Sequence, residues 1–222
     1  MADSAAMKVI VFGATGMVGQ GVLRECLLDP EVENVLAVGR RKTGQQNPKL
    51  GELVHTDFLD FSAVEGELAG YGACFFCLGV SSAGMGEAEY RRVTFDVTMA
   101  AARALAKRNP EMAFIYISGA GTGGGAMWAR VKRETENALM ALFKSAYMFR
   151  PGYIQPLHGV SSSTRWVRVA YALGAPLYPL WKALFPKSVM TTEQLGRAML
   201  HVARHGAPQR VLESRDILAL PM

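Results

Sequence analysis

The sequence predicts an α/β fold in which a doubly wound parallel sheet carries helices on both faces and a small helical segment follows at the C-terminal end. Two observations lead to this prediction. Apolar strand patterns alternate with helical patterns up to about residue 150, at the spacing of β-α-β units. A strand near the start runs into three glycines, three residues apart, and a helical pattern follows them. With 222 residues, 50% of them hydrophobic, the chain has the size of one domain with a sizeable core.

The individual elements follow from apolar periodicity and from residues that end helices. Asp29-Pro30 and Asn109-Pro110 each stop a helical pattern. Strands are expected at residues 8–12, 32–38, 53–56, 73–78, 113–117 and 146–149. Helices are expected at 17–28, 62–68, 87–107 and 127–143. Beyond residue 152 we expect short helical stretches at 164–173 and 177–184 and a longer helix at 191–204, with Thr192 as its N-cap.

The glycine turn after the first strand is the first candidate binding site. A helix N-terminus presents unpaired N–H groups and a partial positive charge, which suit a phosphate or pyrophosphate. Glycines let the backbone approach such a ligand and let the helix pack against the strand. This Rossmann-like context predicts dinucleotide contacts from Gly13, Thr15, Gly16, Met17, Val18 and Gly19.

The end of the second strand indicates which dinucleotide is bound. NAD-binding folds place an acid there to accept from the ribose 2′-hydroxyl. This chain instead has Arg40 and Arg41 after Gly39, and guanidinium groups can fork onto a 2′-phosphate. The alternative is a solvated basic turn. The position favours NADP(H) as the cofactor.

Two further turns are expected at the same edge of the sheet, where open α/β sheets bind ligands. Asp57 and Phe58 follow the third strand, where the Asp57 carboxylate either meets the adenine edge or caps a turn. Leu78 and Gly79 follow the fourth strand, and Gly79 would let the backbone approach the nicotinamide ribose.

The cysteines predict neither a redox nor a metal site. Cys74 and Cys77 lie three apart in an expected strand, so their side chains point to opposite faces and are expected to be inert core thiols. Three cysteines in all are typical of a reducing compartment. The sequence shows no secretory signal pattern, and the expectation is a cytoplasmic location.

Charge is distributed unevenly along the chain. The formal net charge is +5, and residues 150–222 hold nine Lys and Arg against three Asp and Glu. Residues 164–187 mix basic and aromatic side chains, which suits either a substrate lid or contact with a protein or an anionic surface. No nucleic-acid-binding motif is present, so nucleic acid is not an expected partner.

Taken together, several motifs resemble the atypical short-chain dehydrogenase/reductases, in particular the Tat-interacting-protein-like branch. The resemblance spans about residues 8–155 and rests on the glycine turn, Gly39-Arg40-Arg41, Cys77-Leu78-Gly79, Ser118, Lys132 and Arg150-Pro151-Gly152. It implies an NADP-binding core at residues 1–152 and a substrate or lid segment at 153–222 packed on that core. It also implies catalytic roles for Ser118 and Lys132, and cofactor contacts from Lys132, Arg150 and Pro151.

The chain departs from this family at the residue that exchanges the proton. The family uses a Tyr four residues before the Lys, on the same helix face, and this chain has Trp128 there. An indole N–H donates a hydrogen bond but does not titrate usefully. Tyr153 and His158 are the preferred substitutes, whereas Tyr116 is expected to be a core residue. Tyr178 and Lys182 have the right spacing but enclose a proline.

These observations leave two main hypotheses about function. The first is an NADP(H)-dependent oxidoreductase that acts on a small carbonyl or alcohol. The second is a non-catalytic NADPH-binding sensor or interaction module, which Trp128 favours. Nucleotide-sugar epimerisation is disfavoured because it also relies on the missing Tyr.

Overall fold

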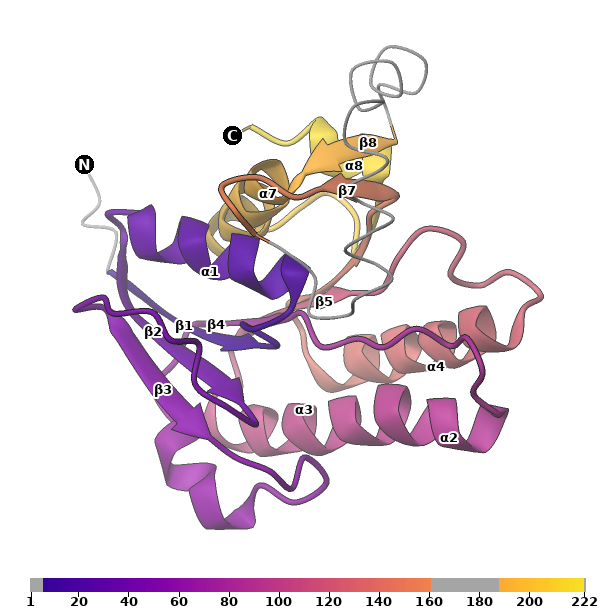
Figure 1. Ribbon diagram of the computed structural model, residues 1–222, viewed down its shortest axis with the longest axis horizontal. Coiled ribbons are helices and arrows are strands. Elements are labelled where there is room, and N and C mark those ends of the chain that lie inside the picture. Colours follow the sequence, from indigo (N-terminus) through magenta and orange to yellow (C-terminus); the bar gives the residue numbers. More distant parts are fainter. Residues whose placement is uncertain (1–5, 161–187, 222) are drawn as a thin grey trace.

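Seven parallel strands form the central sheet, in the order β3-β2-β1-β4-β5-β6-β9. The computed structural model describes residues 6–160 and 188–221 (Figure 1). The strands are β1 (Met7–Phe12), β2 (Val32–Gly39), β3 (Leu50–Val54), β4 (Ala73–Phe76), β5 (Ala113–Ile117), β6 (Ala146–Arg150) and β9 (Val211–Glu213). The strand order reverses between β1 and β4, which confirms the predicted doubly wound fold.

Strands at the centre of the sheet are apolar throughout because both of their faces are covered. Val9 and Val11 of β1 pack into one core cluster, and Ile10 and Phe12 pack into the other. All four are fully buried. The alternation of side chains along each strand therefore produces two cores, one on each side of the sheet.

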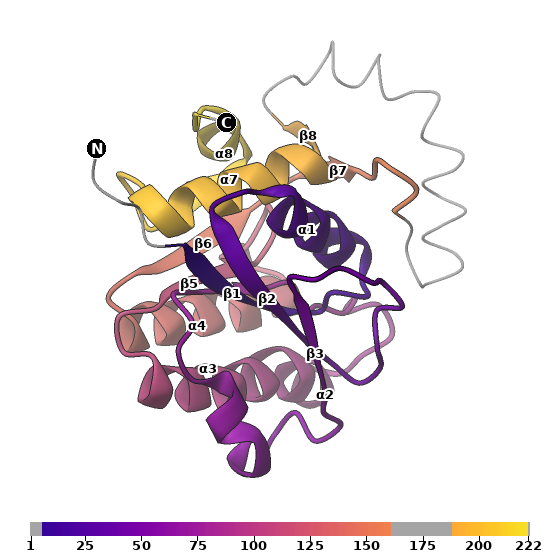
Figure 2. The same ribbon diagram turned by 90° about the vertical axis from the view of Figure 1, so that its left-hand side faces the viewer.

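Helices cover both faces, as Figures 1 and 2 show. On one face lie α1 (Met17–Leu28) and α7 (Thr192–His205). On the other lie α2 (Glu87–Arg91), α3 (Val97–Arg108) and α4 (Met127–Leu142), with the short 3₁₀ helix η1 (Ser62–Leu68) beside α3. This arrangement brings the carboxyl ends of the strands to one edge of the molecule, with the N-terminus of α1 at that edge.

The helix expected at residues 87–107 contains a feature that periodicity did not predict. Between α2 and α3 lies a π-helical turn, η2 (Arg92–Asp96). There the Val97 N–H donates to the carbonyl of Arg92, five residues back. The extra residue in this turn shifts the register of side chains between α2 and α3.

The C-terminal region contains more regular structure than expected. Three strands, β7 (Tyr153–Gln155), β8 (Val189–Thr191) and β9, and one helix, α8 (Ser214–Leu218), were not predicted. Strands of three residues are too short to show periodicity, so sequence patterning misses them. The third strand also begins at residue 50 rather than at 53.

The N-cap of α7 is Thr191, one residue before the expected Thr192. The Thr191 hydroxyl accepts from the Gln194 N–H at 3.1 Å, and the Gln194 side-chain oxygen accepts from the Thr191 N–H at 3.0 Å. The expected helices at 164–173 and 177–184, and the basic aromatic segment that includes Tyr178 and Lys182, lie outside the described residues.

Cys74 and Cys77 face opposite sides of the sheet, as expected from their spacing. Burial raises the pKa of both thiols, that of Cys77 to about 12, which suits inert core residues. Among residues 6–160 and 188–221, no helix has the length and apolar character that a membrane span requires.

Candidate functional site

The glycine turn joins β1 to α1 in a conformation that requires glycine at two positions. Gly13 has a φ of +79°, and a Cβ there would lie 2.9 Å from the Cys77 carbonyl and from the Leu78 nitrogen. A Cβ on Gly19 would overlap the Gly13 carbonyl. The turn is therefore pressed between the end of β4 and the first turn of α1, as a close helix–strand contact demands.

The first turn of α1 is left open to a ligand. Gly16 is its N-cap, no side chain caps it, and its first turn has no acidic residue. Thr15, Gly16, Met17 and Val18 are partly exposed. The N–H groups of such a turn, together with the helix dipole, favour an anion, which is what the glycine pattern predicts.

The basic turn after β2 carries two unpaired cations. Arg40 and Arg41 are exposed, and neither forms an ion pair with any residue that the structure describes. The strand is still paired at Gly39, whose carbonyl accepts from the His55 N–H at 2.9 Å. Arg40 and Arg41 therefore project from the carboxyl end of β2 and remain available to a negatively charged group.

Sequence analysis missed an acid beside this turn. Glu52 of β3 accepts from the Thr43 N–H at 2.6 Å and from the Thr43 hydroxyl at 2.7 Å. These hydrogen bonds hold the pKa of Glu52 below its ordinary value. The sequence did not indicate a contact between Glu52 and Thr43, because Glu52 reaches the turn only through the pairing of β3 with β2.

Asp57 serves as a turn residue, one of its two expected roles. Its carboxylate accepts from the Leu59 N–H at 3.0 Å, and its carbonyl accepts from the Asp60 N–H at 3.2 Å. Phe58 packs edge-on against Phe12, with ring centroids 6.3 Å apart. Phe58 is thereby held against the end of β1.

Leu78 and Gly79 leave β4 next to the glycine turn. The Cys77 N–H donates to the Phe12 carbonyl at 3.0 Å, so the ends of β1 and β4 stay paired up to the turn. Gly79 is exposed, and a Cβ there would meet no atom within 4 Å. The fold alone does not require glycine at this position, and contact with the nicotinamide ribose stays a prediction.

Ser118 follows β5 and is 3% exposed. Its hydroxyl lies 2.7 Å from the Thr122 hydroxyl, which in turn donates to the Gly119 carbonyl at 2.8 Å. A hydroxyl has one proton to donate, so Ser118 is the donor in its bond with Thr122. The Ser118 hydroxyl could donate to a substrate carbonyl only after this bond is broken.

Lys132 reaches Ser118 from α4. Its ammonium group donates to the Ser118 carbonyl and lies 3.9 Å from where a Gly119 Cβ would be. Burial lowers the pKa of Lys132 to about 8, an effect that the carboxylate of Glu136 partly opposes. The structure therefore brings the two predicted catalytic residues together at the carboxyl edge of the sheet.

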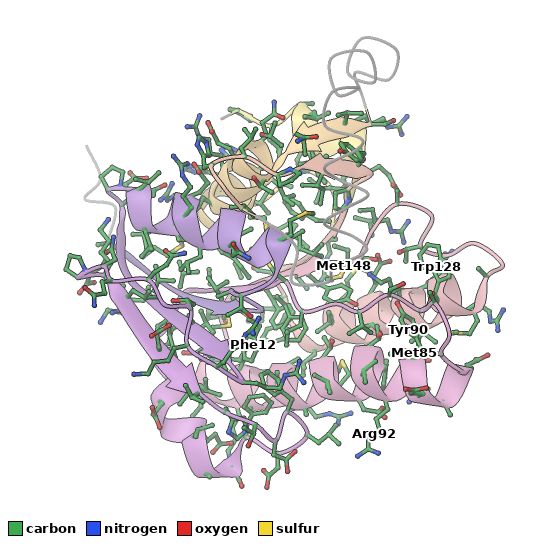
Figure 3. The ribbon with its side chains drawn as sticks, viewed as in Figure 1. Phe12, Met85, Tyr90, Arg92, Trp128 and Met148 are labelled. Carbon is green, nitrogen blue, oxygen red and sulfur yellow. The ribbon has the colours of Figure 1, made fainter. Side chains whose placement is uncertain are left out.

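Trp128 stands at the beginning of α4, one turn before Lys132 (Figure 3). Its ring lies against the glycine-rich loop, 3.2 Å from where a Gly121 Cβ would be. Gly121 has a φ of +84°, so this loop conformation suits glycine for two reasons. The indole occupies the position from which the family's Tyr would act, but it offers no titratable proton.

The other groups considered as proton donors are engaged in the fold. Tyr116 is fully buried, and burial raises its pKa further. The Tyr153 hydroxyl donates to the Gln155 side-chain oxygen at 2.9 Å. His158 has a φ of 57°, and its ring nitrogen lies 2.8 Å from a carboxylate oxygen of Glu193 at the start of α7.

Arg150 makes structural ion pairs with its side chain. Two of its nitrogens contact the Glu136 carboxylate, one of them at 2.9 Å, and a third lies 3.0 Å from Glu213. These carboxylates raise the pKa of Arg150. The Pro151 carbonyl accepts from the Ala120 N–H at 2.9 Å. This segment therefore fixes the loop that follows Ser118, and a cofactor contact from Arg150 or Pro151 stays a prediction.

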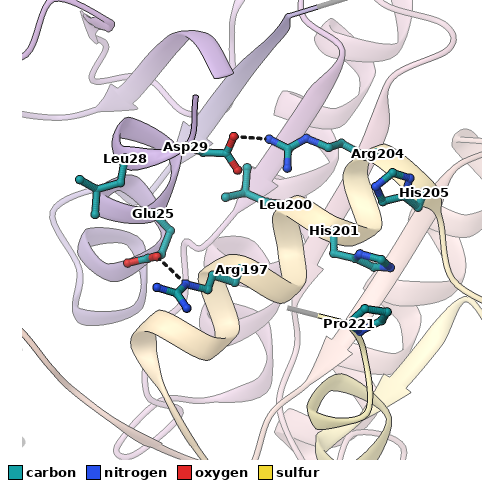
Figure 4. Close-up of a pocket in the computed structure, with 9 residues that line it drawn as sticks. All are labelled: Glu25, Leu28, Asp29, Arg197, Leu200, His201, Arg204, His205 and Pro221. Atoms are coloured by element: carbon teal, nitrogen blue, oxygen red, sulfur yellow. Dashed lines mark hydrogen bonds and ion pairs between the residues drawn. The ribbon is translucent and has the colours of Figure 1, made fainter. Parts of the chain in front are cut away.

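A separate cavity of about 390 Å³ lies between α1, α7 and the C-terminal residues (Figure 4). Ion pairs cross it from Arg197 to Glu25 at 3.2 Å and from Arg204 to Asp29 at 2.6 Å. It lies at the C-terminal ends of α1 and α7, which is the edge of the sheet opposite the glycine turn. Within the described parts of the chain, no three His, Cys, Asp or Glu side chains are grouped to hold a metal ion.

Curated relatives cover nearly the whole chain. Protein FMP52, mitochondrial, of Chaetomium globosum is 28% identical over 95% of this chain and 95% of its own length. Protein HTATIP2 of Rattus norvegicus is 28% identical over 96% of this chain and 88% of its own length. The second relative confirms the resemblance to the Tat-interacting-protein-like branch.

These relatives also correct one expectation. A cytoplasmic location was expected from the cysteine count and the N-terminal sequence. The relatives from Chaetomium globosum, Scheffersomyces stipitis and Eremothecium gossypii are all named as mitochondrial proteins. The cytoplasmic prediction was wrong because neither of the features behind it distinguishes one reducing compartment from another.

Solved structures match the fold over most of the chain. The Bordetella bronchiseptica enzyme WbmF, solved in complex with NAD+, superposes with a TM-score of 0.69 at 15% identity, covering 98% of this chain and 78% of that one. The ADP-L-glycero-D-manno-heptose-6-epimerase of Helicobacter pylori gives a TM-score of 0.67 at 12% identity, with 96% and 78% covered. The profile of a known family matches residues 9–139, more than half of the chain. The chain belongs to the NAD dependent epimerase/dehydratase family.

Proposed function

We propose that this chain binds NADP(H) at the carboxyl edge of its sheet. The observation that carries the proposal is the pair of exposed arginines, Arg40 and Arg41, at the end of β2, with no ion-pair partner among the described residues. The nearby acid, Glu52, lies on β3 rather than at the end of β2, and one of its carboxylate oxygens accepts from Thr43. A 2′-phosphate would therefore meet two cations at this turn.

The remaining contacts follow from the geometry of the same edge. The first turn of α1 is suited to hold the pyrophosphate, and Gly79 is suited to contact the nicotinamide ribose. WbmF, with the same fold, was solved with NAD+. Hydride transfer is the chemistry that the nicotinamide would supply, and Lys132 would hold the ribose beside Ser118.

The cofactor proposal is tested by calorimetric titration with NADPH and NADH. Each charge-assisted hydrogen bond to the 2′-phosphate contributes roughly 1.5–3 kcal/mol. We therefore expect Arg40→Ala and Arg41→Ala each to weaken NADPH binding by about 10-fold or more and to leave NADH binding nearly unchanged. Arg103→Ala is the matched control, because Arg103 is an exposed arginine on α3, the helix that covers the sheet together with α2 and α4. Equal losses for both cofactors would contradict the proposed contact.

We further propose that the bound cofactor serves an oxidoreductase reaction on a small carbonyl or alcohol. Family membership and the meeting of Ser118 with Lys132 support this reading. The substrate would lie beside Ser118, whose hydroxyl must exchange Thr122 for the substrate oxygen. Sugar-nucleotide epimerisation is less well supported, because it relies on the proton exchange that a Tyr provides and Trp128 does not.

A second function, a non-catalytic NADPH-binding module, is favoured by two features of the site. Trp128 does not titrate, and the Ser118 hydroxyl already has an acceptor in Thr122. A turnover screen of small aldehydes and ketones with native protein, Trp128→Tyr and Ser118→Ala decides between the two functions. NADPH oxidation by native protein that is lost in Ser118→Ala supports the oxidoreductase. Oxidation that appears only in Trp128→Tyr supports the binding module.

A further inference from the structure

The arginine turn is anchored to β3 at both of its ends. On one side, the Gly39 carbonyl accepts from the His55 N–H at 2.9 Å. On the other, the Thr43 N–H and hydroxyl both donate to one oxygen of Glu52, at 2.6 and 2.7 Å. Three residues, Arg40, Arg41 and Lys42, lie between these anchors.

Of these two anchors, only the contact between Thr43 and Glu52 depends on a side chain of β3. The hydroxyl of Thr43 also accepts from the Gln45 N–H at 3.2 Å, so Glu52 orders the chain on both sides of Thr43. Glu52 is half-buried and faces Ala37 across the β2–β3 pairing, which gives it a fixed base from which to reach the turn. Without this carboxylate, the two hydrogen bonds that tie Thr43 to β3 would be lost.

We propose that Glu52 is a positioning residue for cofactor selectivity: by binding Thr43, it holds Arg40 and Arg41 in place for a 2′-phosphate. The proposal rests on the proposed NADP(H) function. An anchored turn loses less conformational entropy when its arginines bind the 2′-phosphate. The anchor therefore raises the affinity for NADPH, and it leaves the affinity for NADH, which has no 2′-phosphate, unchanged.

The test compares three substitutions at the anchor by calorimetric titration with NADPH and with NADH. Glu52→Ala removes the acceptor and is expected to lower NADPH affinity by about 5- to 20-fold while NADH affinity changes by less than about 2-fold. Glu52→Gln keeps an acceptor oxygen for Thr43 and is expected to retain most of the selectivity. Thr43→Val removes the hydroxyl donor and is expected to fall between the two.

Glu65→Ala is the matched control for loss of one negative charge. Glu65 lies on η1 and pairs with Lys107 and Arg108, against the α3 face of the sheet. It is expected to leave the NADPH-to-NADH affinity ratio unchanged. A ratio that stays at the native value in Glu52→Ala, or that shifts further toward NADPH, overturns the proposal, because Glu52 would then be a structural residue or a repulsive one.

Amide hydrogen exchange without cofactor separates this proposal from the NADP(H) proposal itself. The amides of Arg41, Lys42 and Thr43 are expected to exchange at least about 10-fold faster in Glu52→Ala than in native protein. Faster exchange with no NADPH preference in the native protein means that the anchor exists but the cofactor assignment fails. Unchanged exchange means that Glu52 does not anchor the turn, and the proposal fails whatever the native protein binds.

Discussion

At the scale of single residues, Lys132 has the most unusual environment in the candidate site. It is a partly buried ammonium group that donates to the Ser118 carbonyl, and desolvation lowers its pKa to about 8. Burying a charge in this way costs folding free energy, and proteins keep such groups mainly where they serve a function. The position of Lys132, next to the expected nicotinamide end, is consistent with such a functional cost.

Replacement of this lysine by methionine is therefore expected to stabilise the protein near neutral pH. A pKa lowered from 10.5 to about 8 corresponds to at most about 3 kcal/mol of folding free energy in Lys132→Met. Because the folded-state pKa is the lower one, the unfolded chain binds more protons between these values, and native stability rises with pH through that window. In Lys132→Met this increase of stability with pH is expected to be absent.

Urea denaturation at pH 7 and at about pH 9.5 checks this prediction. The stabilisation by Lys132→Met should be largest at the lower pH and should shrink at the higher one. Lys144→Met, at a lysine whose side chain is 81% exposed, is the control and should change stability little at either pH. A destabilised Lys132→Met at both values would mean that the ammonium contributes to folding rather than to ligand binding.

At the scale of elements, the close packing of α1 against α7 is the contact that sequence analysis did not anticipate. A Cβ on Gly21 would lie 2.5 Å from the Thr192 Cβ, and one on Gly196 would lie 2.7 Å from the Glu25 Cγ. Both glycines lie within helices, where glycine lowers stability unless packing requires it. Here the two helices can approach closely only because these side chains are absent.

Gly196→Ala is expected to lower the free energy of unfolding by roughly 1–3 kcal/mol, despite the better helix propensity of alanine. The added methyl group would press on Glu25 and separate α7 from α1. Gly66→Ala is the control, because a Cβ there would meet no atom within 4 Å. Thermal denaturation of both variants measures the difference; a Gly196→Ala protein as stable as Gly66→Ala would show that the interface is not tight.

Elements with strong periodicity were predictable from the sequence, and those set by long-range contacts were not. Met17–Leu28 and Ala113–Ile117 match their expected bounds, since their ends are marked by glycine, proline or a polar turn. The π-turn in η2 depends on a local hydrogen bond that leaves no mark on periodicity, the Glu52–Thr43 contact on the pairing of β2 with β3, and the short strand β9 on pairing with the distant β6. The same holds for Arg150, whose partner Glu213 is 63 residues away.

At the scale of the whole molecule, an ion-pair cluster connects α4 and β6 to β9, near the C-terminal end of the chain. Arg150 of β6 contacts Glu136 of α4, which is 1% exposed, and Glu213 at the end of β9. It thereby ties the last strand of the sheet to the helix that carries Lys132. The C-terminal residues thus belong to the same layers as the glycine turn.

Removing the buried acid of this cluster is expected to destabilise the whole fold. Glu136→Ala would leave the Arg150 charge buried beside one partially exposed carboxylate, which costs about 3–5 kcal/mol. Glu213→Ala removes the more exposed partner, at 43% exposure, and is expected to cost about 1 kcal/mol or less. Chemical denaturation of both variants measures their free energies of unfolding. Equal losses in Glu136→Ala and Glu213→Ala would show that the burial of a carboxylate does not decide how much its ion pair with Arg150 contributes to stability.

The central claim is that the glycine turn and the arginine turn together select a 2′-phosphorylated dinucleotide. Side-by-side calorimetric titration of the native protein with NADPH and NADH, at one ionic strength, tests it most directly. We expect NADPH to bind at least about 10-fold more tightly than NADH, since two guanidinium groups would bind the additional phosphate. Tighter binding of NADH, or no binding of either dinucleotide, would contradict it.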